Sequence, residues 1–225
     1  MKTSQLIKWA GLFGIAGGLI LFAGDMLLYY NGNETDRLIN MAVSSDWRII
    51  LSGVFALFAT WFYLLGLIPV YYAFKPAGAL VRNTVIILWS GILTAYGVVH
   101  GAYTAIAVAA KISHQNQLNL VENSRLAIEV NNAIRLFVYP VFFALSVIFI
   151  YQVLKGKTLY PKWILLFYPL LPFLLRKPIS SLLNGKYLII IGGGYLNLIL
   201  ILFFTASFIA LWDKLVVNGE NKTDT

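Results

Sequence analysis

The sequence predicts an all-α integral membrane bundle of about six transmembrane helices, and three observations support this fold class. Of its 225 residues, 60% are hydrophobic and only 12% are charged, whereas a soluble domain is about 45–50% apolar and about 25% charged. The apolar residues gather in continuous runs of about 20 or more, the length that a helix needs to cross the hydrocarbon core. Lysine and arginine lie in the short loops between these runs, as is typical of multi-pass membrane proteins.

The apolar runs form one predicted transmembrane domain, residues 1–215, followed by a polar tail, residues 216–225. Their continuous apolar character argues against an outer-membrane barrel, because barrel strands alternate polar and apolar residues. The six predicted spans cover residues 6–30, 49–74, 84–110, 133–154, 160–175 and 187–212.

Two segments depart from the regular pattern. The run 160–175 is short and contains Pro161, Pro169 and Pro172. Because proline removes a backbone donor and kinks a helix, this span is predicted to be irregular, with a re-entrant segment as the alternative. The polar stretch 112–132 has apolar residues only loosely at helical spacing, which predicts a loop leading into an interfacial helix.

The distribution of positive charge predicts a cell-membrane protein with both termini in the cytoplasm. Basic residues mark the start of the chain and the second and fourth loops, which share one side: Lys2, Lys8, Lys75, Arg82, Lys155, Lys157 and Lys162. The first loop, on the other side, contains both acidic and basic residues. The fifth loop disagrees with this orientation, because it places Arg176, Lys177 and Lys186 outside.

Composition also limits the chemistry and the partners. The chain has no cysteine, which excludes disulfides, thiolate metal sites and cysteine nucleophiles. The net charge of +8 lies mostly in the loops, which favours contact with membrane lipids over binding of nucleic acid. The chain has two histidines, and one of them, His114, is in a loop, so no metal site and no cofactor are expected.

Glycine recurs within several spans at helical spacing. Gly14 and Gly18 form such a pair in the first span, Gly97 and Gly101 form another in the third, and three glycines follow one another at 192–194. Small residues let helices approach closely in lipid. We therefore expect these glycines to pack inside the bundle, and the same Gly-rich helix faces also offer a contact for oligomers.

Charged side chains at membrane depth are costly and therefore mark candidate sites. Asp25 lies in the outer part of the first span, and Tyr29 follows it one helical turn later. His100 lies in the outer half of the third span, where Tyr96 and Tyr103 share its face. Both also have a structural interpretation, as a hydrogen-bonded interfacial carboxylate and a hydrogen-bonding histidine inside the bundle.

Arg135 lies at the start of the fourth span, and its structural interpretation is an arginine that reaches the lipid head groups. With the N-terminus inside, Asp25, His100 and Arg135 all fall in the outer half of the membrane. This coincidence predicts one outward-facing polar pocket, while Asn197 is expected to lie deeper and outside it. The predicted ligand-binding residues are Asp25, Tyr29, Tyr96, His100, Tyr103, Arg135 and Tyr139.

The segment Gly24–Tyr30, with the sequence Gly-Asp-Met-Leu-Leu-Tyr-Tyr, resembles an uncharacterised bacterial family of multi-pass membrane proteins that is defined only as a domain of unknown function. The stretch His100–Tyr103 is similar to a second feature of that family. The resemblance extends over most of the chain. It implies a six-helix membrane domain without an established activity, and it draws attention to Asp25 and to the polar stripe of the third span.

Three functions fit these observations. The leading hypothesis is binding of a small ligand or lipid in the outward-facing pocket. The second is an intramembrane enzyme that uses Asp25 and His100 as an acid–base pair, which requires the two side chains to lie within hydrogen-bond reach, directly or through water. The third is a small transporter, for which the broken span 160–175 is favourable and the absence of an internal repeat is unfavourable.

Overall fold

The structure is a computed structural model that describes the backbone of residues 3–32 and 34–220 and the side chains of residues 5–32 and 34–212. Its described part is all-α, as predicted, and contains no strand. The five long helices are α1 (Thr3–Tyr29), α3 (Asp46–Ala73), α4 (Ala79–Gln115), α5 (Leu120–Leu154) and α8 (Tyr195–Glu220). The short elements are α2 (Arg37–Val43), η1 (Lys75–Ala77), η2 (Lys162–Leu166), α6 (Leu170–Leu174), α7 (Arg176–Ser181) and the π-helical turn η3 (Leu188–Gly193).

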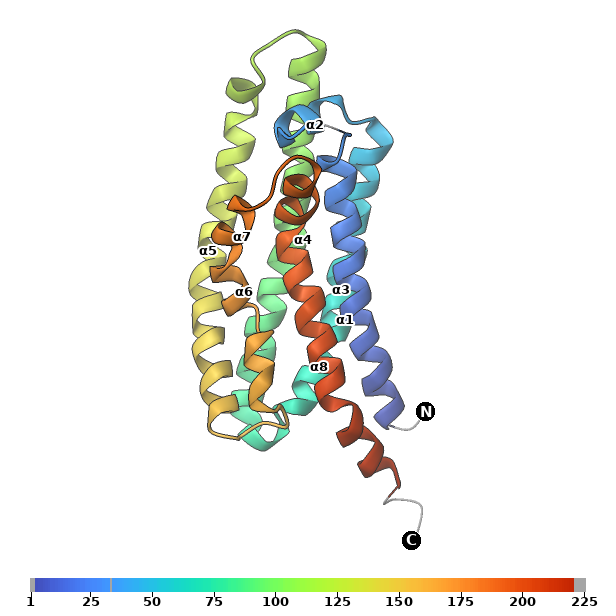
Figure 1. Cartoon of the computed structure of the whole chain (residues 1–225), viewed down its shortest axis with the longest axis vertical. Helices are drawn as coiled ribbons and strands as arrows, with labels where there is room; N and C mark the ends of the chain where they lie inside the picture. Colours follow the sequence, from blue (N-terminus) through green and yellow to red (C-terminus); the bar gives the residue numbers. More distant parts are fainter. Residues whose placement is uncertain (1–2, 33, 221–225) are drawn as a thin grey trace.

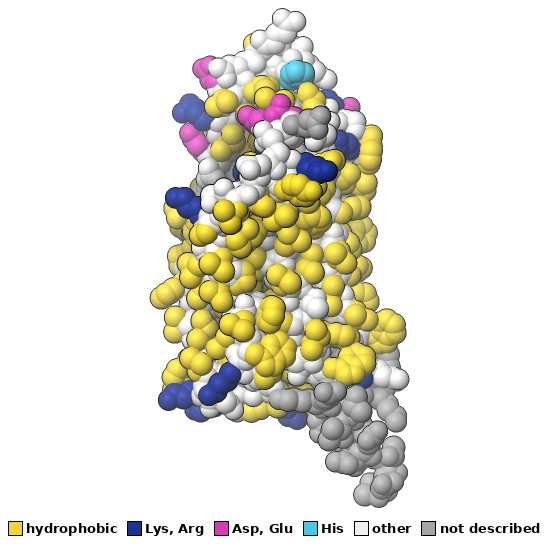
Figure 2. All heavy atoms as spheres, in the orientation of Figure 1, with side chains coloured by type: hydrophobic (Ala, Val, Ile, Leu, Met, Phe, Trp, Pro, Cys, Tyr) yellow, Lys and Arg dark blue, Asp and Glu magenta, His cyan; other side chains and the backbone are white. Residues whose placement is uncertain are grey.

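The five long helices are each long and apolar enough to cross a membrane, which makes the chain a multi-pass membrane protein by length and composition. They stand side by side in one elongated bundle (Figure 1). A broad belt of hydrophobic side chains surrounds the middle of the bundle, and charged side chains gather toward its two ends (Figure 2). On the face shown, the end nearer the chain termini carries Lys and Arg, whereas the opposite end carries both signs of charge.

The predicted span 160–175 is not a single helix, so five long helices replace the expected six. Pro161 precedes η2, and Pro169 precedes α6, which itself contains Pro172. Each proline removes a backbone donor, so no continuous helix forms here. The broken segment nevertheless climbs along the bundle from the end of α5 toward the start of α8 (Figure 1). As a result, the start of α1 and the end of α8 lie at the same end of the molecule.

The stretch 112–132 was predicted as a loop leading into an interfacial helix, and the structure corrects this in part: the loop is shorter, and the helix is the start of α5 rather than a separate element. α4 continues to Gln115, and α5 begins at Leu120, where the Asn119 side chain accepts hydrogen bonds from Val121 N and Glu122 N. Helices of 37 and 35 residues are about 50–55 Å long, whereas the hydrocarbon core is about 30 Å thick. Their outer ends therefore form a helical hairpin that extends past the apolar belt.

The last predicted span, 187–212, is interrupted near its start. It opens with η3, and α8 begins only after Gly194. A side chain at Gly193 would lie 3.2 Å from the Tyr29 ring, so this glycine lets η3 approach α1. The predicted tail, 216–225, lies partly outside the described residues: α8 reaches Glu220, and residues 221–225 are not described.

Close helix contacts use most of the glycines that were expected to pack inside the bundle. A Cβ atom on Gly66 of α3 would lie 2.9 Å from Gly14 N of α1, so these two backbones touch. Gly18 lies against Ile201 of α8. In contrast, Gly101 has no neighbouring atom within 4 Å of the Cβ position. The contact for oligomers stays a prediction, and α1 has its glycines largely covered within the chain.

An aromatic core fills the half of the bundle nearer the termini. Phe149 and Tyr168 stack with ring centroids 4.3 Å apart, and Trp89 stacks on Phe203 at 5.2 Å. Tyr168, Phe203 and Trp89 are each at most 1% exposed. Large rings packed in this way fill that half closely, and the cavity of the bundle borders this core at Trp89 and extends toward the other end.

We predict that residues 115 and 184 face the outside and residue 157 faces the cytoplasm. Because the chain has no cysteine, single substitutions at these exposed positions, Gln115→Cys, Asn184→Cys and Lys157→Cys, report their own side. A membrane-impermeant maleimide should label the first two in intact cells and the third only after permeabilisation. If Asn184→Cys behaved like Lys157→Cys, the broken segment would return to the cytoplasmic side, contrary to this fold.

Candidate functional site

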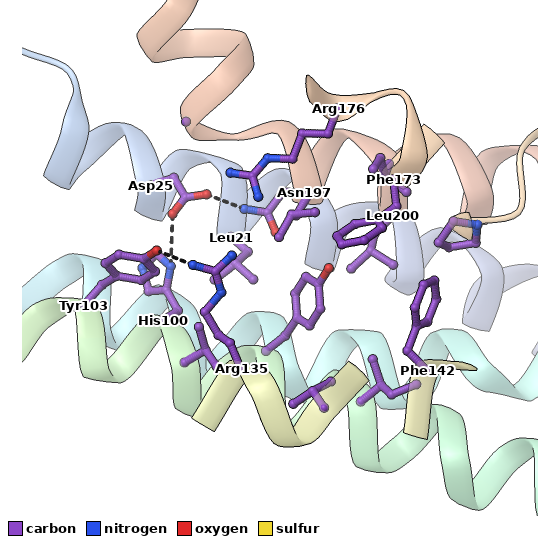
Figure 3. A pocket seen from close by; sticks show the side chains of 18 of the residues that line it. Leu21, Asp25, His100, Tyr103, Arg135, Phe142, Phe173, Arg176, Asn197 and Leu200 are labelled. Atoms are coloured by element: carbon purple, nitrogen blue, oxygen red, sulfur yellow. Dashed lines mark hydrogen bonds and ion pairs between the residues drawn. The ribbon is translucent and has the colours of Figure 1, made fainter. Parts of the chain in front are cut away.

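A cavity of about 120 Å³ lies inside the bundle, large enough for several water molecules by the volume that one water needs. Its walls come from α1, α2, α4, α5, α6, α7, η3 and α8 (Figure 3). All seven residues that the sequence predicts as ligand-binding line this cavity: Asp25, Tyr29, Tyr96, His100, Tyr103, Arg135 and Tyr139. The structure therefore brings the predicted residues together, while their role in binding stays a prediction.

Both oxygens of the Asp25 carboxylate have a partner. Its Oδ1 lies 3.2 Å from His100 Nδ1, and its Oδ2 accepts a hydrogen bond of 2.6 Å from Asn197 Nδ2. Tyr63 OH in turn donates to Asn197 Oδ1 at 3.5 Å. The carboxylate, on a residue only 7% exposed, thus has the partners that a buried charge requires.

The expectation that Asn197 lies outside the pocket is wrong. Asn197 lines the cavity and binds Asp25 directly. The prediction assumed a regular helix from residue 187 when it placed Asn197 in the membrane. The π-helical turn before α8 and the break at Gly194 change the depth and the direction at which Asn197 meets the bundle.

His100 is held on both ring nitrogens. Its Nε2 lies 2.8 Å from Ser52 Oγ, and the same hydroxyl donates to the Gly24 carbonyl at 2.8 Å. The imidazole is therefore fixed between the Ser52 hydroxyl and the Asp25 carboxylate, which its Nδ1 faces.

Gly24 gives His100 the space to reach this position. A Cβ atom on Gly24 would lie 3.2 Å from His100 Nε2 and 3.3 Å from Phe55 Cβ. Both contacts are tighter than packed side chains usually make. The glycine before Asp25 is therefore part of the site, because it lets α4 place its imidazole against the α1 backbone.

Arg135 does not pair with the carboxylate. It donates from Nη1 to Tyr103 OH at 3.3 Å. The Tyr103 ring meets Tyr29 edge-on, with centroids 5.7 Å apart. These contacts place one guanidinium and two phenol rings in the cavity wall, on α5, α4 and α1.

The sequence prediction missed two further arginines that line the cavity, Arg37 and Arg176. Arg37 lies over the Tyr29 ring at 5.8 Å, and α2, which carries it, begins at a cap where Asp36 accepts from Leu38 N and Ile39 N. The Arg176 side chain makes no hydrogen bond or ion pair with any other residue in the described part of the chain. Figure 3 shows Arg176 and Arg135 directed into the cavity from opposite walls.

One sequence signal did point to Arg176. It belongs to the basic fifth loop that disagreed with the predicted orientation. Its position is explained by the broken segment, because α7 begins at Arg176 directly after the proline-containing α6 and so brings the guanidinium to the cavity.

The remaining wall is apolar. Phe173 of α6 contacts both Tyr139 and Phe142 of α5, with centroid distances of 6.1 and 5.9 Å. The other apolar residues of the lining are Leu21, Trp89, Ile92, Val99, Val138, Leu196, Ile199 and Leu200. The cavity therefore has a charged and hydroxyl-bearing part and a hydrocarbon part, as ligand sites commonly do.

Comparison with known proteins identifies a family whose function is not known. Residues 1–214 match a family described as a family of unknown function (DUF6796). No curated protein and no solved structure matches the chain.

We predict that Asp25 and His100 are energetically coupled. Removing one partner of a buried ion pair costs about 3–5 kcal/mol, so Asp25→Asn and His100→Gln together should cost less than the sum of the two. The measurement is a double-mutant cycle on the free energy of unfolding in detergent, with an expected coupling above about 1 kcal/mol.

The matched control is the Arg125–Glu129 pair on the surface of α5, whose side chains are 75% and 58% exposed and lie 3.6 Å apart. A cycle on that pair should give a coupling below about 0.5 kcal/mol. Equal coupling in the two cycles would contradict the assignment of a buried, mutually dependent pair.

Proposed function

The chain belongs to this family of unknown function, and we propose that it is a cell-membrane protein that binds a small ligand or a lipid in the cavity around Asp25 and His100. In this proposal the cavity faces outward and both termini are cytoplasmic. The observation that carries it is the cavity itself. Polar side chains from α1, α4, α5, α7 and α8 converge on one open space inside an otherwise apolar bundle.

Charged groups at membrane depth are unfavourable unless they are paired or serve a purpose. Asp25 is paired, but Arg176 is not, and Arg135 uses one of its five N–H groups on a neutral phenol. A bundle of apolar helices alone does not need these groups. Their presence beside a cavity supports a ligand that interacts with them.

Charge distribution supports the orientation. The basic residues Lys75, Arg82, Lys155, Lys157 and Lys162 belong to the loops at the end where α1 starts. The other end carries the acidic residues Glu34, Asp36, Asp46, Glu122 and Glu129 together with basic ones, among them Arg37, Arg48 and Lys111. The loops at the first end carry only basic charge, which supports a cytoplasmic position for that end. The cavity lies nearer the mixed end and faces outward in this proposal.

The enzyme alternative is favoured by one distance, the 3.2 Å between Asp25 and His100. Two further contacts and one burial count against it. Ser52 holds the second nitrogen of the imidazole, and Asn197 holds the second oxygen of the carboxylate. Ser52 itself is fully buried and does not line the cavity, so it is not placed to act on a ligand there. The pair therefore supports a structural role more strongly than acid–base catalysis.

We predict that filling the cavity abolishes binding. Val138 lines the cavity, whereas Val147 lies on the opposite face of the same helix and is 52% exposed. Val138→Phe should therefore remove the space for a ligand, and Val147→Phe should not. Protein purified in lipid nanodiscs made from a total membrane extract can be analysed by native mass spectrometry. Wild type and Val147→Phe should retain a bound small molecule or lipid that Val138→Phe has lost.

Retention of the same species by all three proteins would contradict binding in this cavity. Absence of any bound species from wild type would contradict the proposal as a whole. Thermal unfolding of the three proteins serves as the control for folding, since both substitutions add the same aromatic ring to α5.

A further inference from the structure

We propose that the occupant of the cavity is a membrane lipid with a phosphate head group, bound mainly by Arg135 and Arg176. This inference rests on the proposed function and specifies its ligand. The cavity has the two parts that such a molecule requires, a cluster of cationic side chains and an adjoining hydrocarbon wall.

The first step is the charge balance of the cavity. Arg37, Arg135 and Arg176 line it, and within the described residues none of them has a carboxylate within ion-pair distance. The only carboxylate in the lining, Asp25, has both oxygens engaged by His100 and Asn197. Three guanidinium groups therefore line the cavity outside any ion pair.

The second step is the kind of anion that fits. A guanidinium is planar and binds oxyanions through two parallel N–H donors, which suits phosphate. A carboxylate carries one negative charge on two oxygens in one plane. The phosphate monoester of phosphatidic acid carries about 1.5 to 2 negative charges at pH 7 and offers three oxygens, and the phosphodiester of phosphatidylglycerol carries one charge on a tetrahedral group. A group that meets arginines from opposite walls, as Figure 3 shows for Arg135 and Arg176, needs oxygens that point in several directions. Phosphate has this geometry.

The third step is the space beside the arginines. The cavity volume of about 120 Å³ holds a head group and the beginning of one chain, but not a whole lipid. Phe142, Phe173 and Val138 line the adjoining part and offer only hydrocarbon. Tyr139, which also lines the cavity, is 42% exposed, so the cavity reaches the lipid-facing surface of α5 at this residue. In this proposal the rest of the lipid's acyl chain passes Tyr139 into the bilayer.

The test compares Arg135→Gln and Arg176→Gln with Lys177→Gln. The last variant removes the same charge one position away from Arg176, from an exposed side chain that does not line the cavity. Each protein is placed in nanodiscs with equal amounts of phosphatidic acid, phosphatidylglycerol and phosphatidylcholine of identical chains. Native mass spectrometry then measures which lipid is retained. A second arm adds inorganic phosphate alone to lipid-free protein in detergent and records thermal unfolding.

Wild type and Lys177→Gln should retain a phosphate-headed anionic lipid about tenfold over phosphatidylcholine, and each arginine variant should lose most of this preference, since a charge-assisted hydrogen bond changes affinity by about tenfold or more. Equal retention of all lipids by every variant, with loss in Val138→Phe, would overturn recognition of an anionic phosphate head group by the arginines but leave binding in the cavity intact. Protection of wild type by inorganic phosphate without selective lipid retention would overturn the lipid and assign a soluble anion. Absence of bound lipid from wild type would overturn the lipid as occupant, whereas the proposed function is tested separately by the total membrane extract.

Discussion

The carboxylate of Asp25 is the group on which the arrangement of this bundle depends. A charge buried in a membrane helix must be satisfied by neighbouring helices, because the lipid offers no partner. Here Asn197 of α8 and His100 of α4 bind the two oxygens of the carboxylate. Ser52 of α3 is hydrogen-bonded to the second nitrogen of the imidazole and also donates to the Gly24 carbonyl of α1. One hydrogen-bonded network therefore connects four of the five long helices. Packing of apolar side chains alone determines the rotation of a helix about its own axis only weakly. The network fixes that rotation for the four helices that it joins.

The proline-broken segment determines where the open space lies. A continuous sixth helix would fill the gap between α5 and α8 along its whole length. The proline-broken segment packs closely against α5 near the chain termini, where Tyr168 stacks on Phe149. Beyond that point the short helices α6 and α7 contribute single side chains, Phe173 and Arg176, to a wall that they do not fill. The irregularity that made this span hard to predict is thus the cause of the cavity.

Much of this architecture follows from local sequence properties. Continuous apolar runs predicted the spans because 20 apolar residues have few other stable environments, and the cost of buried charge singled out Asp25, His100 and Arg135, which share one cavity. What could not be predicted depends on contacts between distant residues. Nothing in the sequence distinguishes Ser52 from other polar residues of apolar helices, because its role depends on contact with His100. The depth of Asn197 depends on the π-helical turn that precedes α8. Arg176 was predicted as a loop residue, because its position depends on how three prolines break a helix.

The two kinds of polar residue in the cavity therefore have different roles. Asp25 and His100, which the sequence marked as the chemical centre, are held by each other and by Asn197 and Ser52. The arginines, which a sequence alone explains as head-group contacts or loop charges, are the groups left without a carboxylate partner within the described residues. The Arg176 side chain is half-buried beside an apolar wall, and no contact inside the bundle accounts for its charge. The unsatisfied charge, rather than the buried acid, is what the cavity presents to a ligand.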